Sequence, residues 1–394
     1  MKSPIARWIA ILLVPATMSP PLPAAETSAA AKPAHEFLAY FGTGRGGANT
    51  GFATANFNAE TGALTLPAVT PTAAAPSIFI FSPDGRRLYT CFPGRTFQGE
   101  PGGGVGAFAV DPVTGGLTAL NTALSGGADP GFLSMDRTGR FLFVANYNGG
   151  NLAVFALQPD GSLGARVYFE QHTGKSVHPT RQGRAYCEVI FTDATNRFVL
   201  CTDLGLDKIF IYRFDEKTGV LTPGEMPFAT MAPGSGPRHA VFGPGEKFLY
   251  VIGEMTNTIA AFAWDAGKGT LTEVETSSTL PADFQGTSSA AEILVHANGR
   301  FLYASNRGHD SLAVFGIDEK TGRLSLVQHV PTRGNIPRCF SFDPTGRWIV
   351  VSNQASDNAV VFRVDAATGK LAQQGDPVAV PSPLQARFLA RPAK

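Results

Sequence analysis

The stretch HANGRFLYASNRGHDSLAVF, residues 296–315, decides the fold of this chain. It begins with a polar turn, continues as an apolar strand over residues 301–305, passes a polar corner and ends in a second strand over residues 311–315. The same pattern begins again at Asp136, Gly243 and Asp343. Because such a short apolar strand cannot bury both of its faces alone, the copies must share one core. The stretch therefore predicts a repeat protein.

A second motif, Asp-x-x-Thr-Gly-x-Leu-Thr, gives the number of repeats. Its glycine is free to adopt the positive φ that a tight turn requires. The motif glycines are Gly62, Gly115, Gly219, Gly269, Gly322 and Gly369, with a weaker copy at Gly161. Their mean spacing of about 51 residues is in the range of propeller blades. With four short strands in each repeat, we expect an all-β, seven-bladed β-propeller.

The two ends of the chain are expected to close the ring. Residues 36–42 have the sequence of a second strand with no first strand before them, and residues 385–389 supply the missing strand. A blade shared by both ends removes two exposed sheet edges. We therefore expect the propeller to occupy residues 35–394 as one domain.

The composition agrees with this fold and argues against some partners. The 394 residues include 44 Gly and 29 Pro, as many tight turns require, and 29 Phe, which need a large apolar interior. The formal net charge is +1 and the chain has no basic run. We therefore expect no nucleic-acid partner.

The first residues have the pattern of a secretory signal. Lys2 and Arg7 precede a short apolar segment, residues 8–14, and a stretch rich in Pro and Ala. We expect a signal peptide over residues 1–25 and a flexible leader over residues 26–34; a disordered tail is the alternative. The apolar segment is too short to cross a bilayer. A periplasmic or secreted monomer without a membrane span is predicted.

The four cysteines have to be examined because an exported protein meets an oxidising compartment. Pairing about the turn at residues 193–196 sets Cys187 opposite Thr202, which turns Cys201 to the other face of the sheet. Cys91 and Cys339 lie in other repeats. We expect four buried free thiols rather than a disulfide. The histidines lack metal-ligand spacing, so neither a metal nor another cofactor is expected.

The candidate site lies where the repeats differ. We compared two positions of each repeat: the residue ten before and the residue six after the one equivalent to Phe248. Because the first and second strands are antiparallel neighbours, both positions should lie at the same mouth of the central channel. Insertions at residues 171–183 and 281–289 fall on one face of such a ring, often the binding face. The charged residues at the two positions are Glu188, Arg238, Glu254, Arg307 and Arg338.

Five further residues complete the candidate set. Tyr147 and Gln354 occupy the second of the two positions, and Glu292 is one residue out of register. His239 and His309 stand beside the charged ring, close in sequence to Arg238 and Arg307. The charged ring could be structural, but buried ion pairs stabilise a fold poorly. Convergent arginines with a carboxylate in a concavity instead suit an anionic substrate, which a neighbouring Glu can serve as acid or base.

Six segments resemble the seven-bladed propeller lactonases, the family of bacterial 6-phosphogluconolactonase and fungal carboxy-cis,cis-muconate cyclase. They are residues 145–155, 171–183, 203–215, 236–242, 278–293 and 305–315. The resemblance implies that Arg238, Glu254 and Arg307 hold and turn over an anionic substrate. It has two departures, because the family's Pro-His-x-His is replaced by Ala185-Tyr186-Cys187-Glu188 and its Asn-Glu by Gly253-Glu254. Proton transfer from that place would have to use Glu188 or Tyr186.

We therefore expect an exported hydrolase that opens the lactone of a sugar acid. Arg238 and Arg307 would bind the substrate and stabilise the oxyanion, while Glu254 activates water and Glu188 takes part in proton transfer. The substrate is not expected to be 6-phosphogluconolactone, a cytoplasmic intermediate. Two alternatives remain open: a cycloisomerase of an unsaturated dicarboxylate, and a non-catalytic propeller that binds an anionic ligand or a protein.

Overall fold

The computed structural model describes Met1 and residues 35–43, 50–65, 68–72 and 74–391. The predicted signal peptide and leader lie outside these described residues, Met1 apart. Contacts divide the chain into a unit of residues 1–33 and a unit of residues 34–394. All of the strands belong to the second unit.

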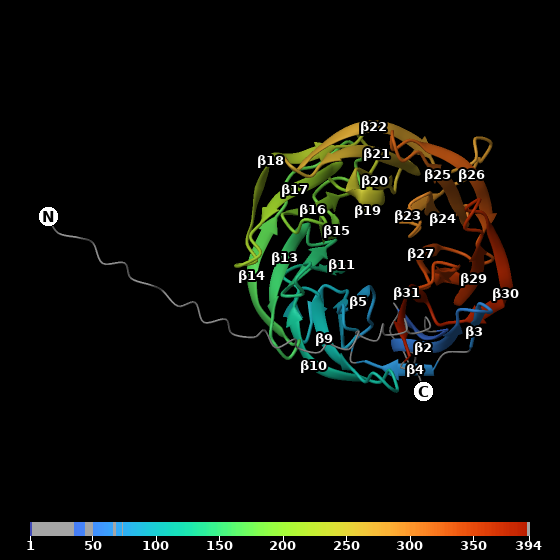
Figure 1. Cartoon of the computed structure of the whole chain (residues 1–394), viewed down its shortest axis with the longest axis horizontal. Coiled ribbons are helices and arrows are strands. Elements are labelled where there is room, and N and C mark those ends of the chain that lie inside the picture. The colour runs from blue at the N-terminus through green and yellow to red at the C-terminus, as the bar shows by residue number, and fades with distance from the viewer. Residues whose placement is uncertain (2–34, 44–49, 66–67, 73, 392–394) are drawn as a thin grey trace. The chain divides into compact units, whose positions relative to one another are not determined.

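Seven antiparallel sheets form the blades (Figure 1). Blade 1 contains β5 (Phe79–Phe81), β6 (Arg87–Phe92), β9 (Gly104–Val110) and β10 (Leu117–Leu124). Blade 2 contains β11 (Pro130–Met135), β12 (Phe141–Asn146), β13 (Asn151–Leu157) and β14 (Leu163–Gln171). Blade 3 contains β15 (Cys187–Thr192), β16 (Phe198–Asp203), β17 (Lys208–Phe214) and β18 (Leu221–Thr230).

The next three blades repeat this order. Blade 4 contains β19 (Pro237–Phe242), β20 (Phe248–Gly253), β21 (Thr258–Asp265) and β22 (Thr270–Ser278). Blade 5 contains β23 (Ser289–Val295), β24 (Phe301–Arg307), β25 (Ser311–Ile317) and β26 (Leu324–Pro331). Blade 6 contains β27 (Pro337–Phe342), β28 (Trp348–Asn353), β29 (Asn358–Val364) and β30 (Leu371–Ala379).

The closing blade joins the two ends of the propeller. It contains β31 (Pro383–Ala390), β1 (Glu36–Thr43), β2 (Gly51–Asn58), β3 (Ala63–Leu64) and β4 (Ala68–Pro71). Strand β31 pairs with β1 in antiparallel register, with Phe37 opposite Ala390. The predicted closure of the ring is therefore confirmed. A small hairpin, β7 (Thr96–Phe97) and β8 (Glu100–Pro101), and two 3₁₀ turns, η1 (Pro244–Glu246) and η2 (Gln354–Ser356), complete the described elements.

The blades are arranged around a central channel. Figure 1 shows the first strand of every blade nearest the centre, from β5 and β11 round to β27 and β31, and the fourth strands, such as β14 and β22, at the perimeter. The described residues include no helix that is long and apolar enough to cross a membrane.

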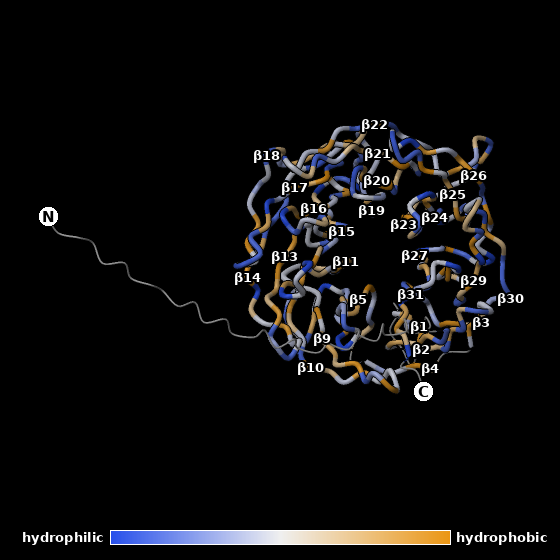
Figure 2. The backbone as a smooth tube through the Cα atoms, viewed as in Figure 1, coloured by the Kyte–Doolittle hydropathy of each residue, from blue (hydrophilic) through white to orange (hydrophobic). Residues whose placement is uncertain are grey.

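The second strands are apolar throughout because both of their faces are covered by neighbouring blades. In β20, Leu249 and Val251 pack with Phe198 of blade 3, whereas Tyr250 and Ile252 pack with Leu302 of blade 5. Successive residues of a strand point to opposite faces, so one run of apolar residues serves two cores. Each pair of neighbouring blades shares one such cluster. Figure 2 shows hydrophobic and hydrophilic segments interleaved in every part of the ring.

The glycine of the repeated Thr-Gly turn is required by close packing as well as by its positive φ. A Cβ on Gly269 would overlap the ring of Phe198, and one on Gly322 would overlap the ring of Phe248. In each case the aromatic residue begins the second strand of the preceding blade. Both glycines also have φ near +74°, at 73° and 74°. The Thr-Gly turn of one blade thus packs on the aromatic residue that begins the second strand of the preceding blade, so the two repeated motifs contact each other.

A bulge in blade 3 corrects the prediction for the cysteines. Cys187 lies opposite Asp203, but Ile190 lies opposite Cys201, so the register shifts between them. Cys187 and Cys201 consequently join the same buried cluster, and the expectation that they face opposite sides of the sheet was wrong. All four cysteines are buried free thiols in the structure.

Candidate functional site

A pocket of about 610 Å³ lies at one mouth of the channel and gathers most of the predicted site residues. It is lined by the ends of first strands and by the corners that follow second strands. Of the candidates, those that line it are Tyr147, Glu188, Arg238, Glu254, Arg307, Arg338 and Gln354.

A bulge recurs at the start of the innermost strands and sets the direction of the side chains that line the pocket. The register shifts between Cys187 and Ile190 in β15, between Pro237 and Ala240 in β19, and between Pro337 and Cys339 in β27. A bulge inserts an extra residue, turns a side chain and is common beside active sites. The bulges therefore separate the variable mouth residues from the regular strands that pack the blades.

Glu254 is the centre of the charge network. Its Oε1 lies 2.5 Å from Nη2 of Arg181, and its Oε2 lies 2.9 Å from Nη1 of Arg238 and 2.9 Å from Nη2 of Arg307. Both carboxylate oxygens are thus occupied by guanidinium groups from three different blades or loops. Arg307 is held further by donating to the carbonyl oxygens of Ser289, at 3.2 Å, and Ala290, at 3.0 Å.

Glu188 shares only one of these arginines. Nη1 of Arg238 lies 3.0 Å from Oε1 and 3.1 Å from Oε2 of Glu188, so one nitrogen joins the two glutamates. Arg338 lines the same pocket but forms no ion pair with a carboxylate of the described residues. With Asp129, the lining holds four guanidinium groups and three carboxylates, an excess of one positive charge.

The surroundings move the pKa values of the two glutamates in opposite directions. Burial raises the pKa of Glu188, and Arg238 does not offset it. Burial also acts to raise the pKa of Glu254, but the charges of Arg238, Arg307 and Arg181 outweigh it and hold that pKa well below its usual range. Burial, together with the charge of Arg238, lowers the pKa of Arg307 to about 10. The pocket therefore contains two carboxyl groups with different proton affinities.

Arg181 is the residue that the sequence analysis missed. It stands in the insertion before β15 and reaches Glu254 and the hydroxyl of Tyr147, which lies 3.4 Å from its Nη2. The rings of Tyr147 and Tyr186 lie 5.0 Å apart. Comparison of equivalent positions could not find Arg181, because the two positions compared lie on the first and second strands and this loop lies outside both. The Arg-Gln-Gly in the insertion was the available signal.

Three of the candidates lie elsewhere. His239 and Glu292 are joined by a 2.8 Å contact between Nδ1 and Oε1, and both line a second cavity of about 80 Å³. The same innermost strands line both cavities, so the second cavity lies deeper in the channel. His309 packs against Phe284, with ring centroids 4.7 Å apart, and its Nδ1 lies 2.6 Å from Oγ of Ser311.

The mouth pocket supplies neither sulfur nor imidazole for a metal, since its described lining includes no Cys or His. His172, Cys187 and Cys201 do converge, in the buried interior between blades 2 and 3. The channel mouth is therefore suited to bind an organic anion by its arginines rather than to hold a soft metal ion.

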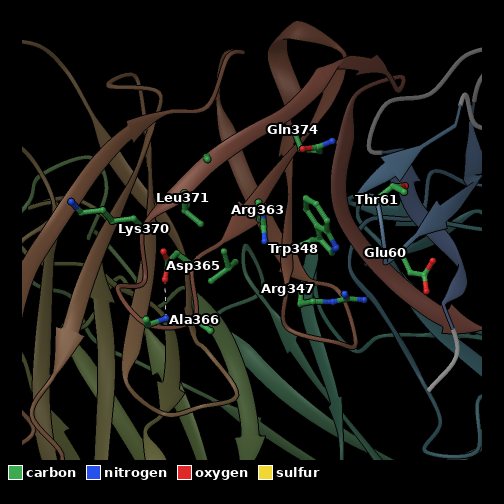
Figure 3. Close-up of a pocket in the computed structure, with 13 residues that line it drawn as sticks. Glu60, Thr61, Arg347, Trp348, Arg363, Asp365, Ala366, Lys370, Leu371 and Gln374 are labelled. Carbon is green, nitrogen blue, oxygen red and sulfur yellow. Dashed lines mark hydrogen bonds between the residues drawn. The ribbon is translucent and has the colours of Figure 1, made fainter. Parts of the chain in front are cut away.

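A wider groove of about 920 Å³ lies at the perimeter, between blade 6 and the closing blade (Figure 3). Arg347, Trp348 and Lys370 line it together with Glu60. These are residues of the turn motifs that every blade repeats, and Figure 3 shows the Asp365 carboxylate bonded to its own turn. The groove is therefore a consequence of blade packing, and its chemistry is less specific than that of the channel mouth.

Comparison with known proteins agrees with the architecture. Residues 38–388 match the family model described as lactonase, 7-bladed beta-propeller. The chain is 36% identical over 354 residues to 6-phosphogluconolactonase of Bacillus subtilis, covering 90% of this chain and 99% of that protein. It is 32% identical over 300 residues to 6-phosphogluconolactonase of Formosa agariphila, covering 75% of this chain and 83% of that one.

A solved structure gives the same result. The periplasmic gluconolactonase of Pseudomonas aeruginosa superposes with a TM-score of 0.85 at 33% identity, over 91% of this chain and 100% of that one. Together, the fold and these matches identify the chain as a member of the lactonase family of seven-bladed β-propellers.

Proposed function

We propose that this protein hydrolyses the lactone of a sugar acid in the channel-mouth pocket. The observation that carries the proposal is the convergence of Arg181, Arg238, Arg307 and Arg338 with two buried glutamates on one concavity. Guanidinium groups bind carboxylate-like oxygens and stabilise the oxyanion that forms when an ester carbonyl is attacked. The residual positive charge of the lining favours a substrate that becomes an anion on hydrolysis.

One of the arginines has its charge available for a substrate. Arg338 lines the pocket and has no carboxylate partner among the described residues, whereas Arg181, Arg238 and Arg307 are all held by Glu254. Arg338 would therefore donate to the carbonyl oxygen, and the three arginines held by Glu254 would shape the pocket.

Glu188 is better placed than Glu254 to act on water. Both oxygens of Glu254 are engaged by guanidinium groups, whereas among the described residues Glu188 forms its ion pair with Arg238 alone. Glu188 would take a proton from water as the water oxygen bonds to the carbonyl carbon. When the tetrahedral intermediate breaks the ring C–O bond, the same proton would pass to the leaving alkoxide. This assignment differs from the expectation that Glu254 activates water.

The names of the relatives indicate a substrate class. One relative is named periplasmic gluconolactonase and another 6-phosphogluconolactonase. Because the sequence predicts a signal peptide, we propose export and an unphosphorylated aldonolactone as substrate. The loss of the family's Pro-His-x-His favours one other candidate, a propeller that binds the sugar acid without turning it over. A cycloisomerase of a dicarboxylate would use the same arginines.

Assays of the purified protein with glucono-δ-lactone and its 6-phosphate test the proposal. We expect consumption of the unphosphorylated lactone above the spontaneous rate, with the acid as product. A rate equal to that in buffer for every lactone, with gluconate still binding, would instead support the non-catalytic candidate. Turnover of an unsaturated dicarboxylate without lactone hydrolysis would support the cycloisomerase.

A further inference from the structure

A second group of chemically active side chains lies between blades 2 and 3, apart from the channel mouth. His172 directly follows β14, Cys187 begins β15, and Cys201 lies in β16. Their ligand atoms all lie within 4.8 Å of one another, and all three residues are buried. Lactone hydrolysis does not use this group.

A carboxylate adjoins two of the three side chains, His172 and Cys187. Nδ1 of His172 lies 3.2 Å from Sγ of Cys187 and 2.8 Å from Oδ2 of Asp203. Sγ of Cys187 lies 3.7 Å from the same oxygen. In a tetrahedral zinc site with bonds of about 2.0–2.3 Å, ligand atoms lie roughly 3.3–3.8 Å apart. The two contacts of Cys187 are close to that spacing, and the shorter His172–Asp203 contact is a hydrogen bond that an ion would replace.

Outer contacts orient the ligand groups. Nε2 of His172 lies 2.7 Å from the hydroxyl of Tyr212. The free oxygen of Asp203, Oδ1, accepts hydrogen bonds from the backbone nitrogens of Tyr186, at 2.8 Å, and Gly205, at 3.0 Å. Metal-binding histidines and carboxylates are held in this way by partners behind them. The group thus has three converging ligand atoms, a carboxylate beside two of them, and outer partners that fix the directions of His172 and Asp203.

We propose that this cluster binds one zinc ion through Nδ1 of His172, Sγ of Cys187 and Sγ of Cys201, with Oδ2 of Asp203 moving in from beside His172 as the fourth ligand. Two sulfurs, one imidazole and one carboxylate form a closed tetrahedral set for a soft divalent ion. On binding, both thiol protons leave to solvent. The single proton of the neutral His172 ring moves to Nε2, where it is donated to the Tyr212 hydroxyl. Because the ligands are buried, the ion enters as the blade folds.

The ion would also fix the neighbouring part of the channel mouth. Cys187 precedes Glu188 in β15, and Asp203 holds the backbone nitrogen of Tyr186. A metal that ties Cys187 to β16 therefore holds the bulge from which Glu188 reaches Arg238. The site is structural, and its existence does not depend on the proposed lactonase activity.

The test is to refold the full chain with zinc or cobalt, remove the excess and measure bound metal by mass spectrometry. We expect one equivalent per chain, and for cobalt an absorption band from thiolate-to-metal charge transfer. Cys187→Ser and Cys201→Ser should lose the ion, whereas Cys91→Ala, which removes a buried thiol of blade 1, should keep it. Tyr212→Phe should weaken affinity by roughly 10–100-fold. Circular dichroism checks the folding of each variant.

The wild-type chain alone can overturn the proposal. Refolded protein that retains no zinc and titrates four free thiols in denaturant would show a hydrogen-bonded cluster without a metal. Two thiols that appear only after reduction would show a Cys187–Cys201 disulfide, which also excludes the site. A cobalt complex without a thiolate band would show binding elsewhere on the chain.

Discussion

One nitrogen of Arg238 joins the two glutamates of the channel mouth: its Nη1 lies 3.0 Å from Oε1 of Glu188 and 2.9 Å from Oε2 of Glu254. The two carboxylates nevertheless differ, because Glu254 is contacted by two further arginines and Glu188 by none. The same arginine thus contacts one carboxyl group whose pKa is held below its usual range and another whose pKa is raised by burial.

Glu188→Gln should remove most of the hydrolytic activity and leave the pocket intact. The amide oxygen can still accept a hydrogen bond from Arg238, but the side chain cannot take a proton from water. We expect kcat to fall by roughly 10²–10⁴-fold with little change in the affinity for gluconate. Steady-state kinetics and calorimetric titration measure the two effects, and unchanged kcat would remove Glu188 from the mechanism.

Arg338→Gln should weaken substrate binding. Because Arg338 has no carboxylate partner among the described residues, its charge is available to the ligand, and a charged hydrogen bond contributes about 1.5–3 kcal/mol. We expect KM for the lactone to rise roughly tenfold or more. Arg347→Gln is the matched control, since Arg347 lies in the same blade but lines the perimeter groove. If Arg347→Gln raises KM and Arg338→Gln does not, the site is in that groove.

The fold was predictable from the sequence because its two motifs are halves of one repeated contact. Gly322 and Phe248 come from different motifs and different blades, yet they pack on each other. The seven blades followed from counting these motifs, and the closure by β31 followed from the unpartnered second-strand sequence at residues 36–42. The charged mouth residues could be found for the same reason: repeats that agree elsewhere differ at those positions.

What escaped prediction depends on features that do not repeat. Arg181 belongs to an insertion that lies outside the two strand positions compared between blades, so that comparison does not select it. The approach of Cys187 to Cys201 needs a bulge, and a one-residue slip reverses the face of a side chain. The difference between Glu188 and Glu254 comes from burial and from the number of arginines around each, which spacing along the chain does not reveal.

Gly269→Ala should destabilise the propeller through the contact between blades 3 and 4. The added methyl group would overlap the ring of Phe198, and the residue has φ of 73°. Gly375→Ala is the control, because Gly375 has φ of 66° but no atom within 4 Å of the added Cβ. The control should cost about 1–3 kcal/mol from backbone strain alone. Gly269→Ala should cost more, as measured by denaturant unfolding; equal losses would show that Phe198 moves aside freely.

Glu254 should contribute stability that depends on pH. Its pKa in the folded protein is held below the usual range, chiefly by Arg238 and Arg307, which outweigh the opposite effect of burial. A carboxyl whose pKa is lower in the folded state stabilises the fold above the pKa of the unfolded chain, about 4.3, and loses this contribution as the pH falls towards the folded pKa. The difference in Tm between the wild type and Glu254→Gln should therefore be largest near pH 7 and shrink below about pH 4. Calorimetry at several pH values measures this difference.

Glu273→Gln, an exposed substitution on the outer strand β22, is the control and should show no such trend. A difference in Tm that is the same at pH 7 and pH 3 would mean that the three arginines do not hold the Glu254 charge.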